Sequence, residues 1–124
     1  MTSYGRTRVT LHFVTLQDQL EDAKPTVFSV NGRSIGLIKS RGKIYAVRNV
    51  CPHKGAPVCE GTLRGTMLPS DPGAFVFGLE NQILQCPWHG WEFDLETGSG
   101  VCESRGHLVL YPVVLKEHSV YLDL

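Results

Sequence analysis

The sequence predicts an all-β fold of short antiparallel strands, and three observations support this prediction. Several short segments rich in β-branched and aromatic residues alternate with polar residues, which is the two-residue period of a half-buried strand. Turn residues separate these segments, and Asn31-Gly32 is a strong hairpin signal because both positions tolerate a positive φ. No segment sustains the 3.6-residue period of an amphipathic helix.

The first half of the chain is expected to form a meander of strands. Residues 1–8 are predicted to be a loose terminus, and residues 16–22 a turn with at most one helical turn, which Lys24-Pro25 ends. Arg41-Gly42-Lys43 predicts a second tight turn. The expected strands of this half are residues 9–14, 26–30, 34–39 and 44–49.

The second half is richer in glycine and proline and is expected to contain a long loop region. Residues 67–71 are predicted to be loop, and residues 74–77 either a short strand or an apolar flap. Residues 95–98 are predicted to turn, and Pro112 indicates that the strand around it is an edge or bulged strand. The expected strands of this half are residues 83–85, 91–94, 107–115 and 119–124.

Length and charge narrow the classes of protein that this chain can be. Its 124 residues correspond to one domain, and 12 Lys and Arg balance 12 Asp and Glu. Without a basic excess, the chain is not expected to bind nucleic acid. No apolar stretch approaches the roughly 20 residues that span a bilayer, and no secretory signal is visible. We therefore expect a soluble, cytoplasmic protein with no membrane partner. In such a protein, four Cys indicate metal or redox chemistry rather than structural disulfides.

Two short motifs, one on each of two predicted loops, form the candidate functional site. Cys51-Pro52-His53 follows one predicted strand, and Cys86-Pro87-Trp88-His89 follows another. Each motif offers one thiolate and one imidazole, and Gly55 and Gly90 permit tight backbone paths beside a metal. Four such ligands suit a tetrahedral metal, or two metals that share bridging atoms. The candidate metal ligands are Cys51, His53, Cys86 and His89.

Other interpretations of these residues stay open at this point. A structural zinc site is one, although zinc fingers usually pair Cys with Cys and His with His, whereas each loop here is mixed. A nucleophilic Cys activated by His is another, but it needs one pair and gives no reason for the second. The spare thiols of Cys59 and Cys102 are expected to be buried and inert, with a disulfide between them as the alternative.

The two motifs resemble those of the Rieske iron–sulfur family, whose pattern is Cys-x-His, a spacer and Cys-x-x-His. The resemblance extends to Gly55-Ala56-Pro57, to Gly90-Trp91-Glu92-Phe93-Asp94 and to the strand pattern of nearly the whole chain. It implies a Rieske-like antiparallel β-sandwich in which residues 1–124 form a single domain. Within it, two loops would form a small cluster-binding subdomain at about residues 50–95.

The resemblance also implies the cofactor and the activity. In this family a [2Fe–2S] cluster has two Cys on one iron and two His on the other. Cys51 and Cys86 would therefore bind one iron, and His53 and His89 the other. A domain of this type has no catalytic site of its own. The chain is expected to be a ferredoxin that carries single electrons, with a flavin-dependent reductase upstream and an oxygenase or other terminal enzyme downstream.

Two alternative functions remain compatible with the resemblance. The chain could be the small Rieske subunit of a larger oxidoreductase, such as a nitrite reductase or an oxygenase. It could also be a redox-sensing module whose cluster state regulates a partner.

The same resemblance indicates a member of low reduction potential. High-potential relatives carry an extra Cys in each loop, joined as a disulfide, and Ser and Tyr hydroxyls near the cluster. Fewer hydrogen bonds to the cluster stabilise its more negative, reduced form less. We therefore expect a potential near the bottom of the roughly −150 to +300 mV Rieske range. The matching positions of this chain, which lack these groups, are Ala56, Trp88, Trp91 and Phe93.

The spacer between His53 and Cys86 is the main departure from the family pattern, at roughly twice the usual length. The excess is expected at about residues 66–80. A longer loop between two fixed ends costs little, because the closure entropy grows only with the logarithm of its length. The insertion could cover the cluster or form a docking surface, or it could be a packed surface excursion.

Overall fold

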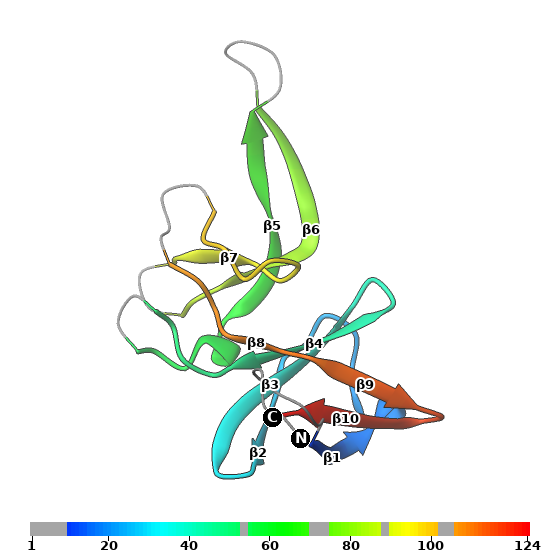
Figure 1. Ribbon diagram of the computed structural model, residues 1–124. Coiled ribbons are helices and arrows are strands. Elements are labelled where there is room, and N and C mark those ends of the chain that lie inside the picture. The colour runs from blue at the N-terminus through cyan, green and yellow to red at the C-terminus, as the bar shows by residue number, and fades with distance from the viewer. Residues whose placement is uncertain (1–9, 53–54, 70–74, 88–89, 102–105) are drawn as a thin grey trace, which may run out of the picture.

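The computed structural model describes residues 10–52, 55–69, 75–87, 90–101 and 106–124, with the backbone alone described at residues 64–69 and 75–81. Within these residues the chain forms three antiparallel sheets, which confirms the all-β prediction (Figure 1). The first sheet has the order β1 (Leu11–Leu16), β10 (Ser119–Asp123) and β9 (Val113–Lys116). The second has the order β2 (Thr26–Val30), β3 (Arg33–Ser40), β4 (Lys43–Arg48) and β8 (Leu110–Tyr111). The third has the order β5 (Thr62–Pro69), β6 (Phe75–Gln85) and β7 (Glu92–Asp94).

Helical structure is confined, in the described part of the chain, to two single turns. These are the 3-10 helices η1 (Gln17–Gln19) and η2 (Val58–Glu60). The first confirms the predicted single turn after the first strand. Neither turn, nor any other described segment, is an apolar helix long enough to cross a membrane.

The second sheet is the central layer of the fold, because both of its faces are buried. Successive side chains of a strand point to opposite faces. Ile35 and Leu37 of β3 accordingly pack with Leu122 of β10 in one apolar cluster. Ile38 of β3 packs on the opposite face in a second cluster, which contains the two candidate ligands Cys51 and Cys86. The site is thus built on the face of the central sheet that lies away from the termini.

The hairpins of the first half agree with the sequence-based expectation. Asn31 and Gly32 have φ of 51° and 76°, and Arg41 and Gly42 have φ of 53° and 78°. Both pairs have the two positive φ values of the tight turns that match the twist of the flanking strands. The strands on either side begin and end within about two residues of the predicted positions. Residues 1–9, predicted to be mostly loose, lie outside the described part.

The strand predicted at residues 107–115 is wrong, because Pro112 divides it into two strands in different sheets. β8 pairs with β4 of the central sheet, whereas β9 pairs with β10 of the first sheet. Proline has no N–H to donate to a ladder, so the chain leaves one sheet there and enters the other. Each of the two short strands lies at the edge of its sheet, as the proline predicted.

The segment that was predicted to be an insertion belongs to a long hairpin and is not mainly a loop. Met67–Pro69, predicted to be loop, belong to β5, where Met67 pairs with Phe77. The brief strand predicted at residues 83–85 is the end of β6, which has 11 residues. The two strands are longer than predicted because they pair with each other over most of their length, and local periodicity does not reveal such pairing. The outer half of this hairpin stands clear of the other labelled strands (Figure 1). Its tip, residues 70–74, lies outside the described part.

Candidate metal centre

Both candidate cysteines are buried at the ends of strands. Cys86 follows β6 directly, and Cys51 follows β4 after a two-residue link. Cys86 is 2% exposed and Cys51 is 1% exposed, neither is joined in a disulfide, and both belong to the same apolar cluster. The fold therefore brings two residues that are 35 positions apart in the chain into one buried region.

The two loops that begin at these cysteines share one backbone pattern. The Cys51 N–H donates to the Ala56 carbonyl, and the Cys86 N–H donates to the Trp91 carbonyl, each at 2.7 Å. Each bond spans five residues. The fourth residue after each cysteine is a glycine with a positive φ, 73° at Gly55 and 68° at Gly90. Because L side chains rarely adopt this conformation, glycine allows each loop to turn back on its own cysteine. The glycine spacing was visible in the sequence, but the closing hydrogen bonds were not.

The histidines of the two motifs, His53 and His89, lie outside the described residues. The structure therefore locates two of the four candidate ligands. Within the described part, no three His, Cys, Asp or Glu side chains gather around a common point. The donor chemistry of the located pair fits an iron–sulfur group, because two buried cysteines outside any disulfide supply the soft sulfur donors that a cluster requires.

Apolar side chains surround the two thiols. Ala56 and Phe93 are fully buried in the same cluster, and Trp91 packs against it. The Trp91 and Phe93 rings lie 6.4 Å apart at an interplanar angle of 44°. Trp91 thus lies beside the region that contains the two thiols and also contributes to the packing of this core cluster. No hydroxyl group is present at Ala56, Trp91 or Phe93, so these three positions offer no O–H donor to a bound group.

Asn49 joins the first loop to its surroundings, and the sequence did not single it out. Its side-chain oxygen accepts the Cys59 N–H at 2.9 Å, and its side-chain nitrogen donates to the Ser34 hydroxyl at 3.2 Å. Its own N–H donates to the Ser34 carbonyl at 3.0 Å. These bonds fix the link between β4 and Cys51 against two other segments. The only signal in the sequence was a polar residue just before the motif.

Cys59 is a buried thiol outside the ligand set. It is 4% exposed, and burial raises its pKa to about 12. The thiolate is the nucleophilic and metal-binding form of cysteine, so Cys59 is a poor ligand or nucleophile where it lies. It is free in the structure, which agrees with the expected inert thiol. Cys102 lies outside the described residues.

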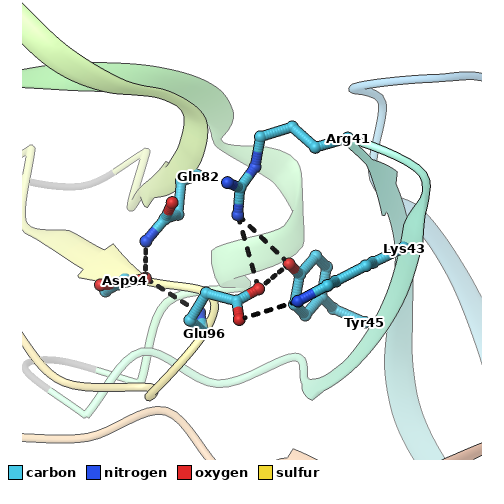
Figure 2. A network of polar contacts seen from close by, with 6 residues as sticks. All are labelled: Arg41, Lys43, Tyr45, Gln82, Asp94 and Glu96. Carbon is cyan, nitrogen blue, oxygen red and sulfur yellow. Dashed lines mark hydrogen bonds and ion pairs between the residues drawn. The ribbon is translucent and has the colours of Figure 1, made fainter.

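A polar network joins the turn after β7 to the turn between β3 and β4 (Figure 2). The Tyr45 hydroxyl donates to the Glu96 carboxylate. Lys43 Nζ and Arg41 Nη2 lie 3.3 and 3.4 Å from the same carboxylate. The hydrogen bond from Tyr45, followed by the two cations, holds the pKa of Glu96 below its usual value. The network thus connects the third sheet to the central sheet. The second ligand loop joins β6 and β7 of the third sheet.

On the third sheet, Asp94 continues this network. Its carboxylate oxygen accepts the Gln82 side-chain amide at 2.8 Å and the Glu96 N–H at 2.9 Å (Figure 2). Gln82 is only 9% exposed, and this bond supplies its buried side-chain nitrogen with an acceptor inside the protein. The turn that carries Glu96 is therefore held from both sides.

The substitution Glu96→Gln is expected to lower the free energy of unfolding by about 1 kcal/mol, because a partly exposed charged hydrogen-bond acceptor is lost. Since the folded-state pKa of Glu96 is lowered, its contribution is present above its unfolded pKa and is lost as the pH falls through the folded value. Urea unfolding at neutral and acidic pH measures both effects. Glu21→Gln is the matched control, because the exposed Glu21–Lys24 pair at 3.4 Å should contribute almost nothing. Equal losses in the two variants would contradict the role of the network.

The sequence of this chain is similar to a known protein family and to individual proteins. The sequence profile of the family described as "Rieske [2Fe-2S] domain" matches residues 10–109. The chain is 30% identical over 112 residues to the ferredoxin component of the naphthalene 1,2-dioxygenase system of Pseudomonas putida, covering 90% of this chain and 91% of that one. It is 28% identical over 96 residues to the ferredoxin component of the alkene monooxygenase system of Xanthobacter autotrophicus, covering 77% of this chain and 66% of that relative.

The fold has solved counterparts. The ferredoxin of carbazole 1,9a-dioxygenase from Nocardioides aromaticivorans IC177 superposes with a TM-score of 0.73, covering 92% of this chain and 97% of that one. The sequence identity is 23%, so this likeness concerns the fold.

Proposed function

This chain belongs to the Rieske [2Fe-2S] domain family, and we propose that within this family it serves as a ferredoxin, carrying single electrons between a reductase and an oxygenase. The electron-carrier role follows from relatives that are ferredoxin components of oxygenase systems. A carrier of this type is not itself a catalyst. We propose that a flavin-dependent reductase donates the electron and that an oxygenase or other terminal enzyme accepts it.

The proposed ligands of the cluster are Cys51 and Cys86 on one iron, and His53 and His89 on the other. One observation carries this assignment: two buried cysteines, neither of them in a disulfide, begin two loops that close with the same five-residue hydrogen bond. In the sequence, a histidine stands two residues after Cys51 and three residues after Cys86, before the glycine of each motif. A single thiol with a single histidine would not need the second loop.

A bound [2Fe–2S] cluster supplies one-electron chemistry, and the protein supplies its surroundings. The apolar side chains around Cys51 and Cys86 exclude water from the thiol side of the site. Exclusion of water and the pattern of hydrogen bonds set the reduction potential of such a site. The backbone N–H groups of both cysteines already donate to carbonyls within their own loops, which fixes the direction of each side chain.

The organisation of the chain supports the same function. We propose that residues 1–124 act as a single domain, with the ligand loops and the third sheet as a cluster-binding subdomain at about residues 50–95. The insertion proposed at about residues 66–80 corresponds to the outer part of the β5–β6 hairpin. We propose that the protein acts in the cytoplasm.

The protein should replace the ferredoxin of a reconstituted oxygenase system. The probe is the naphthalene 1,2-dioxygenase system of Pseudomonas putida, supplied with its reductase and oxygenase but without its own ferredoxin. Product formation that depends on the concentration of this chain supports the proposal. Tight co-purification with a catalytic chain, together with no transfer by the isolated protein, would instead favour the small subunit of a larger oxidoreductase.

The reduction potential is predicted to lie near the bottom of the roughly −150 to +300 mV Rieske range. Ala56 and Phe93 are fully buried and carry no hydroxyl to donate a hydrogen bond to the cluster. Fewer donors stabilise the reduced, more negative state less, which lowers the potential. A spectroscopic redox titration of the purified protein measures this value. A clearly positive midpoint would show that donors other than these positions reach the cluster.

A further inference from the structure

A basic pocket lies on the central sheet beside the first ligand loop. It has a volume of about 530 Å³ and is the place where the turn after β2, the end of β4 and β8 meet. None of its lining side chains takes part in the ligand loops or in the polar network of Figure 2. We call it the arginine pocket, and its lining residues are Gly32, Arg33, Ser34, Arg48, Val50 and Tyr111.

The charge of the arginine pocket is uncompensated in the described part of the protein. Arg33 of β3 and Arg48 of β4 are both exposed, and no described Asp or Glu side chain forms an ion pair with either. Arg41, by contrast, pairs with Glu96. A guanidinium offers a fork of N–H donors that matches a carboxylate. Two such groups at one hollow, in a chain of zero net charge, favour a negatively charged partner.

One exposed apolar side chain lines the same pocket, and a second belongs to a residue bonded to the Arg48 backbone. Val50 is 40% exposed and Val109 is 47% exposed. The Arg48 N–H donates to the Val109 carbonyl at 2.9 Å, so both valines lie close to the Arg48 backbone. Arginine beside exposed apolar surface, with few acidic residues, is a composition typical of the centre of protein–protein interfaces. The occupant it fits is a protein surface that carries carboxylates, because a small anion would leave the valines uncovered.

The pocket is also fixed to the first ligand loop. Val50 lines the pocket and directly precedes the buried Cys51. Ser34, which also lines the pocket, accepts hydrogen bonds from the Asn49 backbone N–H at 3.0 Å and from the Asn49 side-chain nitrogen at 3.2 Å. A partner seated in the pocket would therefore lie next to the residue that precedes a proposed cluster ligand. This position is suited to electron exchange.

We propose that the arginine pocket receives carboxylate groups from an acidic surface of the protein that exchanges electrons with this chain. The inference rests on the proposed function and names the surface through which it operates. Charge pairing at such a site steers the encounter and sets the orientation more than it adds affinity.

Stopped-flow oxidation of the reduced protein tests this surface. The probes are ferricyanide, a trianion that stands in for the acidic surface, and hexaammineruthenium(III), a trication. At low ionic strength, Arg33→Glu/Arg48→Glu is expected to slow oxidation by the trianion about tenfold, but not oxidation by the trication. The difference should disappear at high salt, because ions screen exposed charges. Lys24→Glu/Lys116→Glu is the control, with the same change of net charge on residues away from the pocket.

Binding without electron transfer gives a second readout. The redox-inert trianion hexacyanocobaltate(III) should shift the Nε–H NMR signals of Arg33 and Arg48 but not that of Arg41. Unchanged rates in the pocket variant, or equal slowing in the control variant, would overturn the inference, as would an Arg41 shift equal to the other two. A wild-type protein that binds no cluster would instead overturn the proposed function, and that result is visible before any kinetic measurement.

Discussion

Replacing Cys51 or Cys86 by serine is expected to abolish stable binding of the cluster, with a loss of affinity well beyond the 10–100-fold typical of supporting residues around a metal. Each thiol is buried in an apolar region, so a serine hydroxyl there supplies a harder donor without replacing the thiolate. Iron and sulfide content and visible absorption of the purified variants measure this effect. The free energy of unfolding should fall with the cluster, since ligand binding to the folded state stabilises it.

Cys59→Ser is the matched control for these two variants. Like Cys51 and Cys86, Cys59 is not joined in a disulfide. It is nearly as buried as they are, and it packs in the same cluster of side chains. Its loss should cost some stability, because a hydroxyl replaces a packed thiol, but the iron content should remain that of the unmodified protein. If Cys59→Ser lost the cluster while Cys86→Ser kept it, the assignment of the ligands would be wrong.

The substitution Gly61→Ala is expected to destabilise the fold by about 3 kcal/mol or more and to reduce cluster content. A Cβ at this position would overlap the carbonyl oxygen of Gln85, and it would also lie 3.1 Å from the Val58 carbonyl. Backbone cannot move aside as a flexible side chain can. Gln85 directly precedes Cys86, so any shift of its carbonyl displaces the start of the second ligand loop.

Gly32→Ala separates this clash from the general effect of removing a glycine. Gly32 has a φ of 76°, but a Cβ there would meet no atom within 4 Å. It should cost only the backbone strain of a left-handed residue, about 1 kcal/mol, and leave the cluster in place. Denaturant unfolding combined with iron analysis compares the two variants. Similar losses of stability and equal iron content would show that the Gln85 contact does not constrain the loop.

Local chemistry made much of the fold predictable. The Asn31-Gly32 and Arg41-Gly42 turns have the positive φ values that their residue types allow. The two cysteine motifs end strands, as the apolar segments before them indicated. These features depend on a few neighbouring residues, and the sequence carries them directly.

The features that the sequence did not reveal depend on residues far apart in the chain. The β5–β6 hairpin extends because Met67 pairs with Phe77, and each strand lacks a strong period of its own. Pro112 predicted an irregular strand, but the exchange between two sheets depends on where β4 and β10 lie. The hydrogen bonds of Asn49 and those of Glu96 likewise join segments that are close together only in the folded chain.

Ligation of the cluster by two cysteines and two histidines is the central claim, and labelled histidine tests it most directly. The protein would be produced with [15N]histidine, reduced, and studied by pulsed EPR, with His53→Ala and His89→Ala as variants. We predict hyperfine coupling from two histidine nitrogens in the unmodified protein. His12→Ala should leave both couplings unchanged. A reduced cluster without coupling to histidine nitrogen, or a colourless protein that contains zinc, would contradict the claim.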